Sequence, residues 1–158
     1  ALTIRARGTV SSSASNGVNA THAGSGDLDV SVANAYGNAQ VIANQTGINV
    51  DNNGTGVTSV TANSVTATDG DAIYVNSAAS TTSLSVTTTG TVRSTNEDGI
   101  EASHDGTGNL TFTATNADGD ALVSGGSSGI YARNRGTGSA YITVNNASGG
   151  AGAGDERY

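Results

Sequence analysis

The chain has 158 residues, with 23 Gly, no Pro, Cys, Met or Trp, and a single Phe. It has too few large apolar side chains for a broad globular core, which leaves polar disorder or a repeat fold with a thin core of small apolar residues. The formal net charge is −7, and without a cationic cluster nucleic acid is excluded as an expected partner. The absence of Cys excludes disulfides and thiolate metal sites. No run of about 18 apolar residues occurs, so we expect no membrane insertion by this segment.

A short unit in which apolar and polar residues alternate recurs along the whole chain. Its copies are Leu2–Ile4, Leu28–Val30, Thr58–Val60, Leu84–Val86, Leu110–Phe112 and Ala140–Ile142. Successive copies start 26, 30, 26, 26 and 30 residues apart. Alternation with a period of two is typical of β-strands, and the regular spacing indicates a repeat architecture.

Further markers keep the same rhythm. A Gly-Thr-Gly or related turn precedes each later copy, at residues 24–26, 54–56, 80–82, 106–108 and 136–138. A second strand starts at Val18, Ile48, Ile73, Ile100 and Ile130, and a third short strand between the two includes Val10, Val65, Val92 and Leu122. Three strands and three turns therefore make one coil of 26–30 residues. The longer coils are predicted to carry four extra turn residues, at 35–38 and near 118–121.

The sequence therefore predicts an all-β fold, a right-handed single-stranded parallel β-helix (a β-solenoid) of about five coils. Stacked coils place equivalent residues about 4.8 Å apart, so each coil buries the apolar residues of its neighbours. One inner column would be Ile4, Val30, Val60, Val86, Phe112 and Ile142, and another Val18, Ile48, Ile73, Ile100 and Ile130. We assign residues 1–148 to the repeat segment and expect residues 149–158 to be a flexible C-terminal tail.

Two stretches carry a resemblance to a known family. Asp98–Ala102, followed by Gly106–Gly108 and Leu110–Phe112, resembles the coils of autotransporter (type V secretion) passenger domains, and Gly129–Asn134 followed by Gly136–Gly138 has the same pattern. The resemblance covers about residues 2–148 and implies an exported adhesin, aggregation factor or virulence stalk of a Gram-negative bacterium. The signal and membrane-anchoring regions of that family are not recognised in these 158 residues.

Outward-facing strand residues are the candidate binding sites. Tyr74 and Tyr131 are predicted to point outward two coils apart, with Glu101 between them, and exposed Tyr can stack on sugars or anchor a protein interface. One polar ladder consists of Ser31, Thr61, Thr87, Thr113 and Thr143, and a second of Thr3, Asp29, Ser59, Ser85, Thr111 and Tyr141. Such a face could pair with another molecule, and it is similar to the flat Thr arrays of ice-binding β-solenoids, although Arg5, Asp29 and Tyr141 interrupt it. The plainer interpretation is that these are ordinary exposed strand residues.

Four acidic residues, Asp69, Asp71, Glu97 and Asp98, lie just before the second strand of two adjacent coils. Clustered carboxylates can bind Ca²⁺ or form the catalytic pair of a glycan-cleaving enzyme, but Asp is also an ordinary turn residue, and solvated turns are the simpler interpretation. Calcium is therefore the one cofactor considered.

The two histidines, His22 and His104, are predicted to occupy one turn column three coils apart. That separation is about 14 Å from the coil spacing, which is too far for a shared metal ion. We expect both to be exposed turn residues.

These observations favour a structural stalk or adhesin segment of an autotransporter-like protein, located outside the cell at the Gram-negative outer membrane. Its expected partners are a second copy of itself or a ligand on a host or bacterial surface. We find no catalytic constellation and expect no enzymatic activity. The alternatives are a polysaccharide-degrading β-helix enzyme and an ice-binding β-solenoid.

Overall fold

The computed structural model describes residues 1–150 and contains strands and turns only, with no helix in that range. Residues 151–158 of the predicted C-terminal tail lie outside the described residues. Its strands form three parallel sheets, here named A, B and C. Sheet A contains β1 (Leu2–Ala6), β4 (Leu28–Val32), β7 (Gly56–Ala62), β10 (Thr81–Thr88), β13 (Leu110–Ala114) and β16 (Ala140–Val144). Sheet B contains β2 (Thr9–Ser12), β5 (Gln40–Ala43), β8 (Ser64–Ala67), β11 (Thr91–Ser94), β14 (Leu122–Ser124) and β17 (Asn146–Ser148). Sheet C contains β3 (Val18–His22), β6 (Ile48–Asn52), β9 (Ile73–Ser77), β12 (Ile100–His104) and β15 (Ile130–Asn134).

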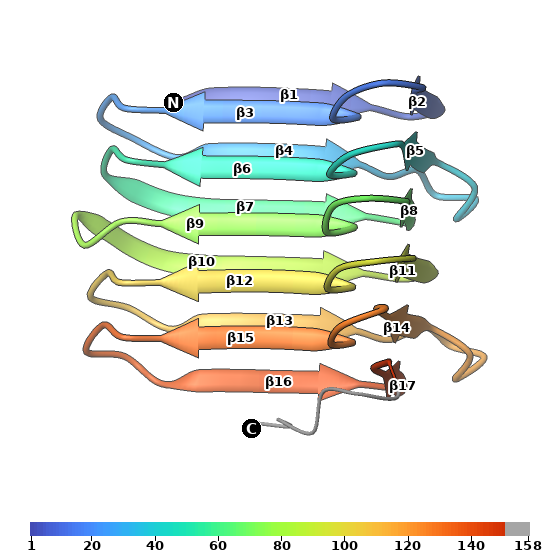
Figure 1. Ribbon diagram of the computed structural model, residues 1–158. Coiled ribbons are helices and arrows are strands. Elements are labelled where there is room, and N and C mark those ends of the chain that lie inside the picture. Colours follow the sequence, from blue (N-terminus) through green and yellow to red (C-terminus); the bar gives the residue numbers. More distant parts are fainter. Residues whose placement is uncertain (151–158) are drawn as a thin grey trace.

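The chain visits the sheets in the fixed order A, B, C and then starts the next coil (Figure 1). Sheets A and B have six strands and sheet C has five, which gives five complete coils and two strands of a sixth. Seen from the N-terminal end, the chain turns clockwise as it moves away from the viewer, so the solenoid is right-handed (Figure 1). The predicted β-helix is confirmed.

The register between coils follows the repeat that the sequence shows. In sheet A the pairs run Ile4↔Val30↔Val60↔Val86↔Phe112↔Ile142. In sheet C they run Val18↔Ile48↔Ile73↔Ile100↔Ile130. Both predicted inner columns are therefore confirmed. In sheet B the pairing Val92↔Val123 makes Val123 the inward residue of β14. Leu122, which was predicted beside Val92, lies in this strand but pairs with Thr91 one position earlier.

The core is a single cluster that runs along the solenoid axis. Most of its residues are Val, Ile, Leu and Ala, and Phe112 is its largest fully buried side chain. Along β13 the inward residues Leu110, Phe112 and Ala114 are buried, and the residues between them are partly exposed. Because each coil contributes only a few small side chains, burial depends on the coils above and below.

The two longer coils insert their extra residues where sheet A turns into sheet B, as predicted. The inserted turns lie between β4 and β5 and between β13 and β14, and both project from the same side of the solenoid (Figure 1). In the first, the Asn34 side-chain oxygen accepts hydrogen bonds from the backbone N–H groups of Tyr36 and Asn38. Gly37 closes that turn with φ of 72°, a value that an L side chain would adopt only with strain.

The histidines correct one prediction, because both point inward rather than lying exposed in a turn. They end β3 and β12, and His104 is fully buried. Their column is His22, Asn52, Ser77, His104 and Asn134, so the predicted three-coil separation holds. Each histidine Nε2 lies 3.2 Å from a backbone carbonyl, that of Gly26 or Gly108. Since a carbonyl can only accept, Nε2 carries the proton in both rings.

A first prediction concerns the core. We expect Phe112→Ala to lower the free energy of unfolding by about 3–5 kcal/mol, because it removes buried surface and leaves a cavity between coils. Thr113→Ala, one residue further on the outer face of the same strand, should change it by less than about 0.5 kcal/mol. Urea unfolding followed by far-UV circular dichroism measures both. Equal losses in the two variants would contradict the inward–outward assignment of β13.

A second prediction concerns His104. Burial lowers its pKa below 6.5, more than the opposing influences of the Gly108 carbonyl and Asp105 raise it. The folded state therefore binds fewer protons at this site than the unfolded state, and stability should fall as the pH drops below about 6.5. In His104→Asn this part of the acid sensitivity should disappear, and Asn134 in the same column already donates to the matching carbonyl, of Gly138, at 2.7 Å. Melting temperatures between pH 7.5 and 5 test this, and an unchanged pH profile in the variant would reject it.

Candidate functional site

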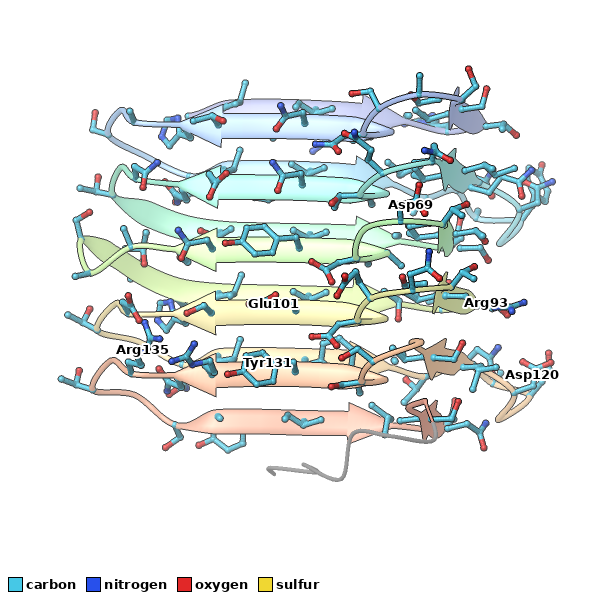
Figure 2. All side chains as sticks on the ribbon, in the orientation of Figure 1. Asp69, Arg93, Glu101, Asp120, Tyr131 and Arg135 are labelled. Carbon is cyan, nitrogen blue, oxygen red and sulfur yellow. The ribbon has the colours of Figure 1, made fainter. Side chains whose placement is uncertain are left out.

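The outer face of sheet C carries the most varied side chains of the solenoid. One outward column there is Asn19, Asn49, Tyr74, Glu101 and Tyr131. Tyr74 and Tyr131 thus lie two coils apart with Glu101 directly between them, as predicted, and all three are half-buried against the sheet. Figure 2 shows the ring of Tyr131 lying along β15, with its face turned away from the sheet. We name Tyr74, Glu101 and Tyr131 the tyrosine column.

A cationic side chain accompanies the tyrosine column. The guanidinium carbon of Arg133 lies 5.7 Å from the centre of the Tyr131 ring, which is within the range of a cation–π interaction. Arg133 occupies the next outward position of β15, and its charge also acts on Glu101. The sequence analysis did not associate Arg133 with Tyr131. The signal was available, because residues two apart in a strand lie on one face.

Carboxylates gather where the turns from sheet B enter sheet C. Oxygens of Asp71, Asp98 and Glu101 all lie within 4.8 Å of one another. Asp71 accepts a hydrogen bond from the Asp98 N–H at 3.1 Å, and Asp98 accepts one from the Ser128 N–H at 2.8 Å. Asp98 is only 9% exposed. These bonds run from coil to coil and fix both aspartates in the stack.

Of the four acidic residues that the sequence analysis grouped, only Asp71 and Asp98 belong to this cluster. Asp69 is exposed, and its carboxylate accepts hydrogen bonds from the side-chain amides of Asn44 and Asn96, at 3.1 and 2.9 Å. Glu97 is exposed as well. The third member of the cluster, Glu101, was identified in the sequence only as the neighbour of the tyrosines.

Burial and mutual repulsion alter the protonation of this cluster. Burial raises the pKa of Asp71 to about 6, with smaller contributions from the charges of Glu101, Asp98 and Glu97, and against the hydrogen bond from Asp98. Burial also raises the pKa of Glu101, and Asp98 adds to the effect while Arg133 opposes it. The pKa of Tyr74 is raised by burial first and then by the charges of Asp51, Glu101 and Asp71.

Two chemistries are available to such a group. Three carboxylates at this spacing offer the hard oxygen ligands that Ca²⁺ takes. A carboxyl group with a pKa of about 6, such as that of Asp71, can also act as a general acid beside a second carboxyl group. The candidate calcium ligands are therefore Asp71 and Asp98 from the predicted group, together with Glu101.

The outer face of sheet A carries the predicted hydroxyl ladders. Ser31, Thr61, Thr87, Thr113 and Thr143 pair in register, and Thr3, Asp29, Ser59, Ser85, Thr111 and Tyr141 form the column beside them. On β7, β10 and β13 both columns contain only Ser and Thr. We name these six residues of β7, β10 and β13 the hydroxyl array. Arg5 and Asp29 bound it at one end and Tyr141 at the other, as predicted.

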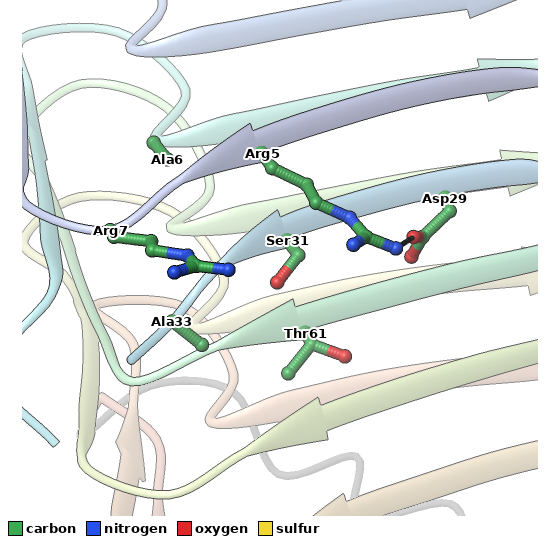
Figure 3. Close-up of a pocket in the computed structure, with 7 residues that line it drawn as sticks. All are labelled: Arg5, Ala6, Arg7, Asp29, Ser31, Ala33 and Thr61. Carbon is green, nitrogen blue, oxygen red and sulfur yellow. Dashed lines mark hydrogen bonds and ion pairs between the residues drawn. The ribbon is translucent and has the colours of Figure 1, made fainter. Parts of the chain in front are cut away.

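A shallow depression of about 310 Å³ lies at the N-terminal end of the hydroxyl array, and Thr61 of the array is part of its lining. Figure 3 shows Arg5 reaching across to Asp29 on the next coil, while Arg7 lies over Ala33. The Arg5–Asp29 ion pair has an N···O distance of 3.2 Å, and the Arg5 side chain is 65% exposed, so the pair contributes little to stability. The sequence analysis identified these two residues as interruptions of the ladders but did not pair them.

Within residues 1–150, no helix is long and apolar enough to cross a membrane. Comparisons with protein-family models, with curated protein sequences and with solved structures give no match. The fold and the side-chain geometry are therefore the basis for a proposal about function.

A third prediction concerns Asp71. Its pKa is 3.8 in the unfolded chain and about 6 in the folded one, so between these values the folded state binds more protons and stability should fall as the pH rises. Asp71→Asn keeps the oxygen that accepts from Asp98 and removes the charge. We expect it to stabilise the protein at pH 7 by on the order of 1 kcal/mol, after allowing for solvent screening, and to have no effect near pH 3.5. Asp118→Asn, in an exposed inserted turn, is the control, and equal effects of the two substitutions at pH 7 would contradict the account.

Proposed function

We propose that this chain is a structural stalk or adhesin segment of a secreted, autotransporter-like bacterial surface protein. It acts outside the cell, at the surface of a Gram-negative bacterium, by adhesion to a surface ligand or by self-association. The observation that carries the proposal is the repetition of the same outward polar groups, in register, on successive coils. A partner that spans several coils meets several equivalent contacts at once, and weak contacts then add to a firm attachment.

The difference in charge between the outer faces of sheets A and C suits them to different contacts. The hydroxyl array (Ser59, Thr61, Ser85, Thr87, Thr111 and Thr113) has no charged member. Two copies can therefore approach through sheet A without repulsion, and their hydroxyl groups can act as both donors and acceptors. Sheet C carries the Asp71–Asp98–Glu101 cluster, so two C faces repel one another. We assign self-association to sheet A and ligand binding to sheet C.

The resemblance of the coil motifs to autotransporter passenger domains supports the same proposal. Asp98–Ala102 and Gly129–Asn134, which carry the resemblance, enter and form β12 and β15 in the repeating coil. A solenoid of this kind extends along one axis and presents its lateral faces over its whole length. That geometry suits a spacer that also makes side contacts.

A polysaccharide-degrading enzyme is the second candidate, and one observation favours it. Asp71 has a pKa of about 6 and lies beside Glu101 and Asp98, which resembles the acid–base pair of a glycosidase. Release of reducing sugar from a polysaccharide, abolished in both Asp71→Asn and Glu101→Gln, would support this candidate over the first.

A fourth prediction tests the proposed function on cells. A non-adherent bacterium that displays this chain should clump and adhere more than the same bacterium displaying an unrelated β-solenoid. Replacing Thr61, Thr87 and Thr113 together by Arg should reduce clumping several-fold, because like charges then face each other across the A faces.

The matched control adds the same charge to sheet B, as Thr9→Arg, Ser64→Arg and Thr91→Arg, which lie in one outward column. It should leave clumping unchanged. Surface labelling confirms equal display of all variants. Neither clumping nor adherence above the unrelated solenoid would reject the proposed function.

A further inference from the structure

We infer that the tyrosine column on sheet C is a binding strip for an uncharged, extended glycan chain that runs parallel to the solenoid axis. This inference rests on the proposed function, because it assigns a ligand class to the face already proposed for adhesion. It is carried by the spacing and presentation of Tyr74 and Tyr131, and the neighbouring charges decide which glycans are accepted.

The spacing of the two tyrosines suits alternate sugars of one chain. They lie on β9 and β15, separated by the single strand β12, so their Cα atoms are about 9.6 Å apart, twice the inter-strand distance. Alternate pyranose rings of an extended β-1,4-linked chain are separated by a similar distance. Two rings of the glycan can therefore stack on the two tyrosines while the ring between them lies over Glu101.

The presentation of the rings favours stacking on sugars over edge contacts. The face of Tyr131 is turned outward along β15 (Figure 2). The Arg133 guanidinium lies over this ring, with its carbon 5.7 Å from the ring centre, so a sugar that stacks on Tyr131 takes the place of that side chain. A tyrosine ring that lies against a sheet has already lost side-chain freedom, so binding has less entropy to remove. The apolar face of a sugar can then stack on the tyrosine ring, while polar side chains around the ring form hydrogen bonds with the sugar hydroxyl groups.

Polar groups border the column on the positions where sugar hydroxyl groups would lie. Asn49 continues the column on β6, and Asn76 stands one outward position along from Tyr74, with its amide directed to Asp51 at 3.5 Å. Glu101 is an acceptor between the two rings. Hydroxyl groups both donate and accept, so amides and carboxylates can serve them without any charge on the ligand.

The charges near the column exclude polyanionic glycans. Asp51, Asp71 and Glu101 act electrostatically on Tyr74, and Asp98 lies within the cluster that contains Asp71 and Glu101. At the other end of the column Arg133 lies over the Tyr131 ring. A glycan with a carboxylate or sulfate on each residue would meet these carboxylates along the coils that carry Tyr74 and Glu101. An uncharged glycan meets no such repulsion.

The fifth prediction tests the strip with the full chain and defined probes. Hexasaccharides of β-1,4-linked glucose, mannose and N-acetylglucosamine are titrated by isothermal calorimetry, with a galacturonic acid hexamer as the anionic comparison. At least one uncharged hexamer should bind, and the anionic one should not. Tyr74→Ala and Tyr131→Ala should each weaken binding about tenfold, the double variant should abolish it, and Tyr74→Trp should retain it.

Tyr36 and Tyr141 provide matched controls. Tyr36 is 90% exposed in an inserted turn and Tyr141 is 55% exposed on sheet A, and replacing either by Ala should leave glycan binding unchanged. Circular dichroism melting checks that the outward substitutions leave the fold intact. No binding of any uncharged hexamer, tighter binding of the galacturonic acid hexamer, or equal loss in the control variants would overturn the inference. If displayed cells adhere but no hexamer binds, the inference fails and the proposed function stands; if a hexamer binds but displayed cells neither adhere nor clump, the reverse holds.

Discussion

The structure depends on one constraint, the in-register parallel pairing of each strand with the strand one coil away. Backbone hydrogen bonds hold successive strands about 4.8 Å apart, and a slip of one residue would turn every inward side chain outward. Each inner position must therefore be filled by a residue that packs against the residues at the same position in the neighbouring coils. Val30, Val60 and Val86 do so in sheet A, and Phe112 is accommodated among small neighbours. The same pairing aligns the outward residues, because residues alternate between inside and outside along each strand and equivalent residues of successive coils lie side by side.

Outer columns give the surface its chemistry. A residue type that recurs at one position of the repeat becomes a stripe, as in the hydroxyl array of sheet A. A departure from the repeat becomes a local feature: Tyr74, Glu101 and Tyr131 replace the asparagines of the earlier coils in the same column. The turns also contribute side chains to the surface, because Asp71 and Asp98 lie at the edge of sheet C with their carboxylates close to that of Glu101.

The sequence was sufficient for the coil lengths, both strong inner columns, the two inserted turns and the pairing of the tyrosines with Glu101. The errors came from applying the period of two incompletely. His104 is four residues after the inward Ile100, so parity alone places it inside, as the structure has it. Val123 rather than Leu122 points inward, because Val123 pairs with the buried Val92 and Leu122 pairs with the exposed Thr91. The members of the acidic cluster could not be predicted from the sequence, because side chains in turns follow no fixed period. Only the structure shows that Asp71 and Asp98 belong to the cluster and that Asp69 and Glu97 do not.

Burial in the core leaves the outer faces of the three sheets as the places where side chains can contact a ligand. The core is a thin column of buried side chains, and the depression beside Arg5 is shallow and open to solvent (Figure 3). Residue types can therefore vary most freely at outward positions, because a substitution there changes a surface contact and leaves the strand register unchanged. A surface built in this way gains affinity by length, since each added coil adds another copy of the contact. The uncharged hydroxyl array lies on sheet A, and the tyrosines among carboxylates lie on sheet C. Their residues can change independently, because the buried core separates the two faces.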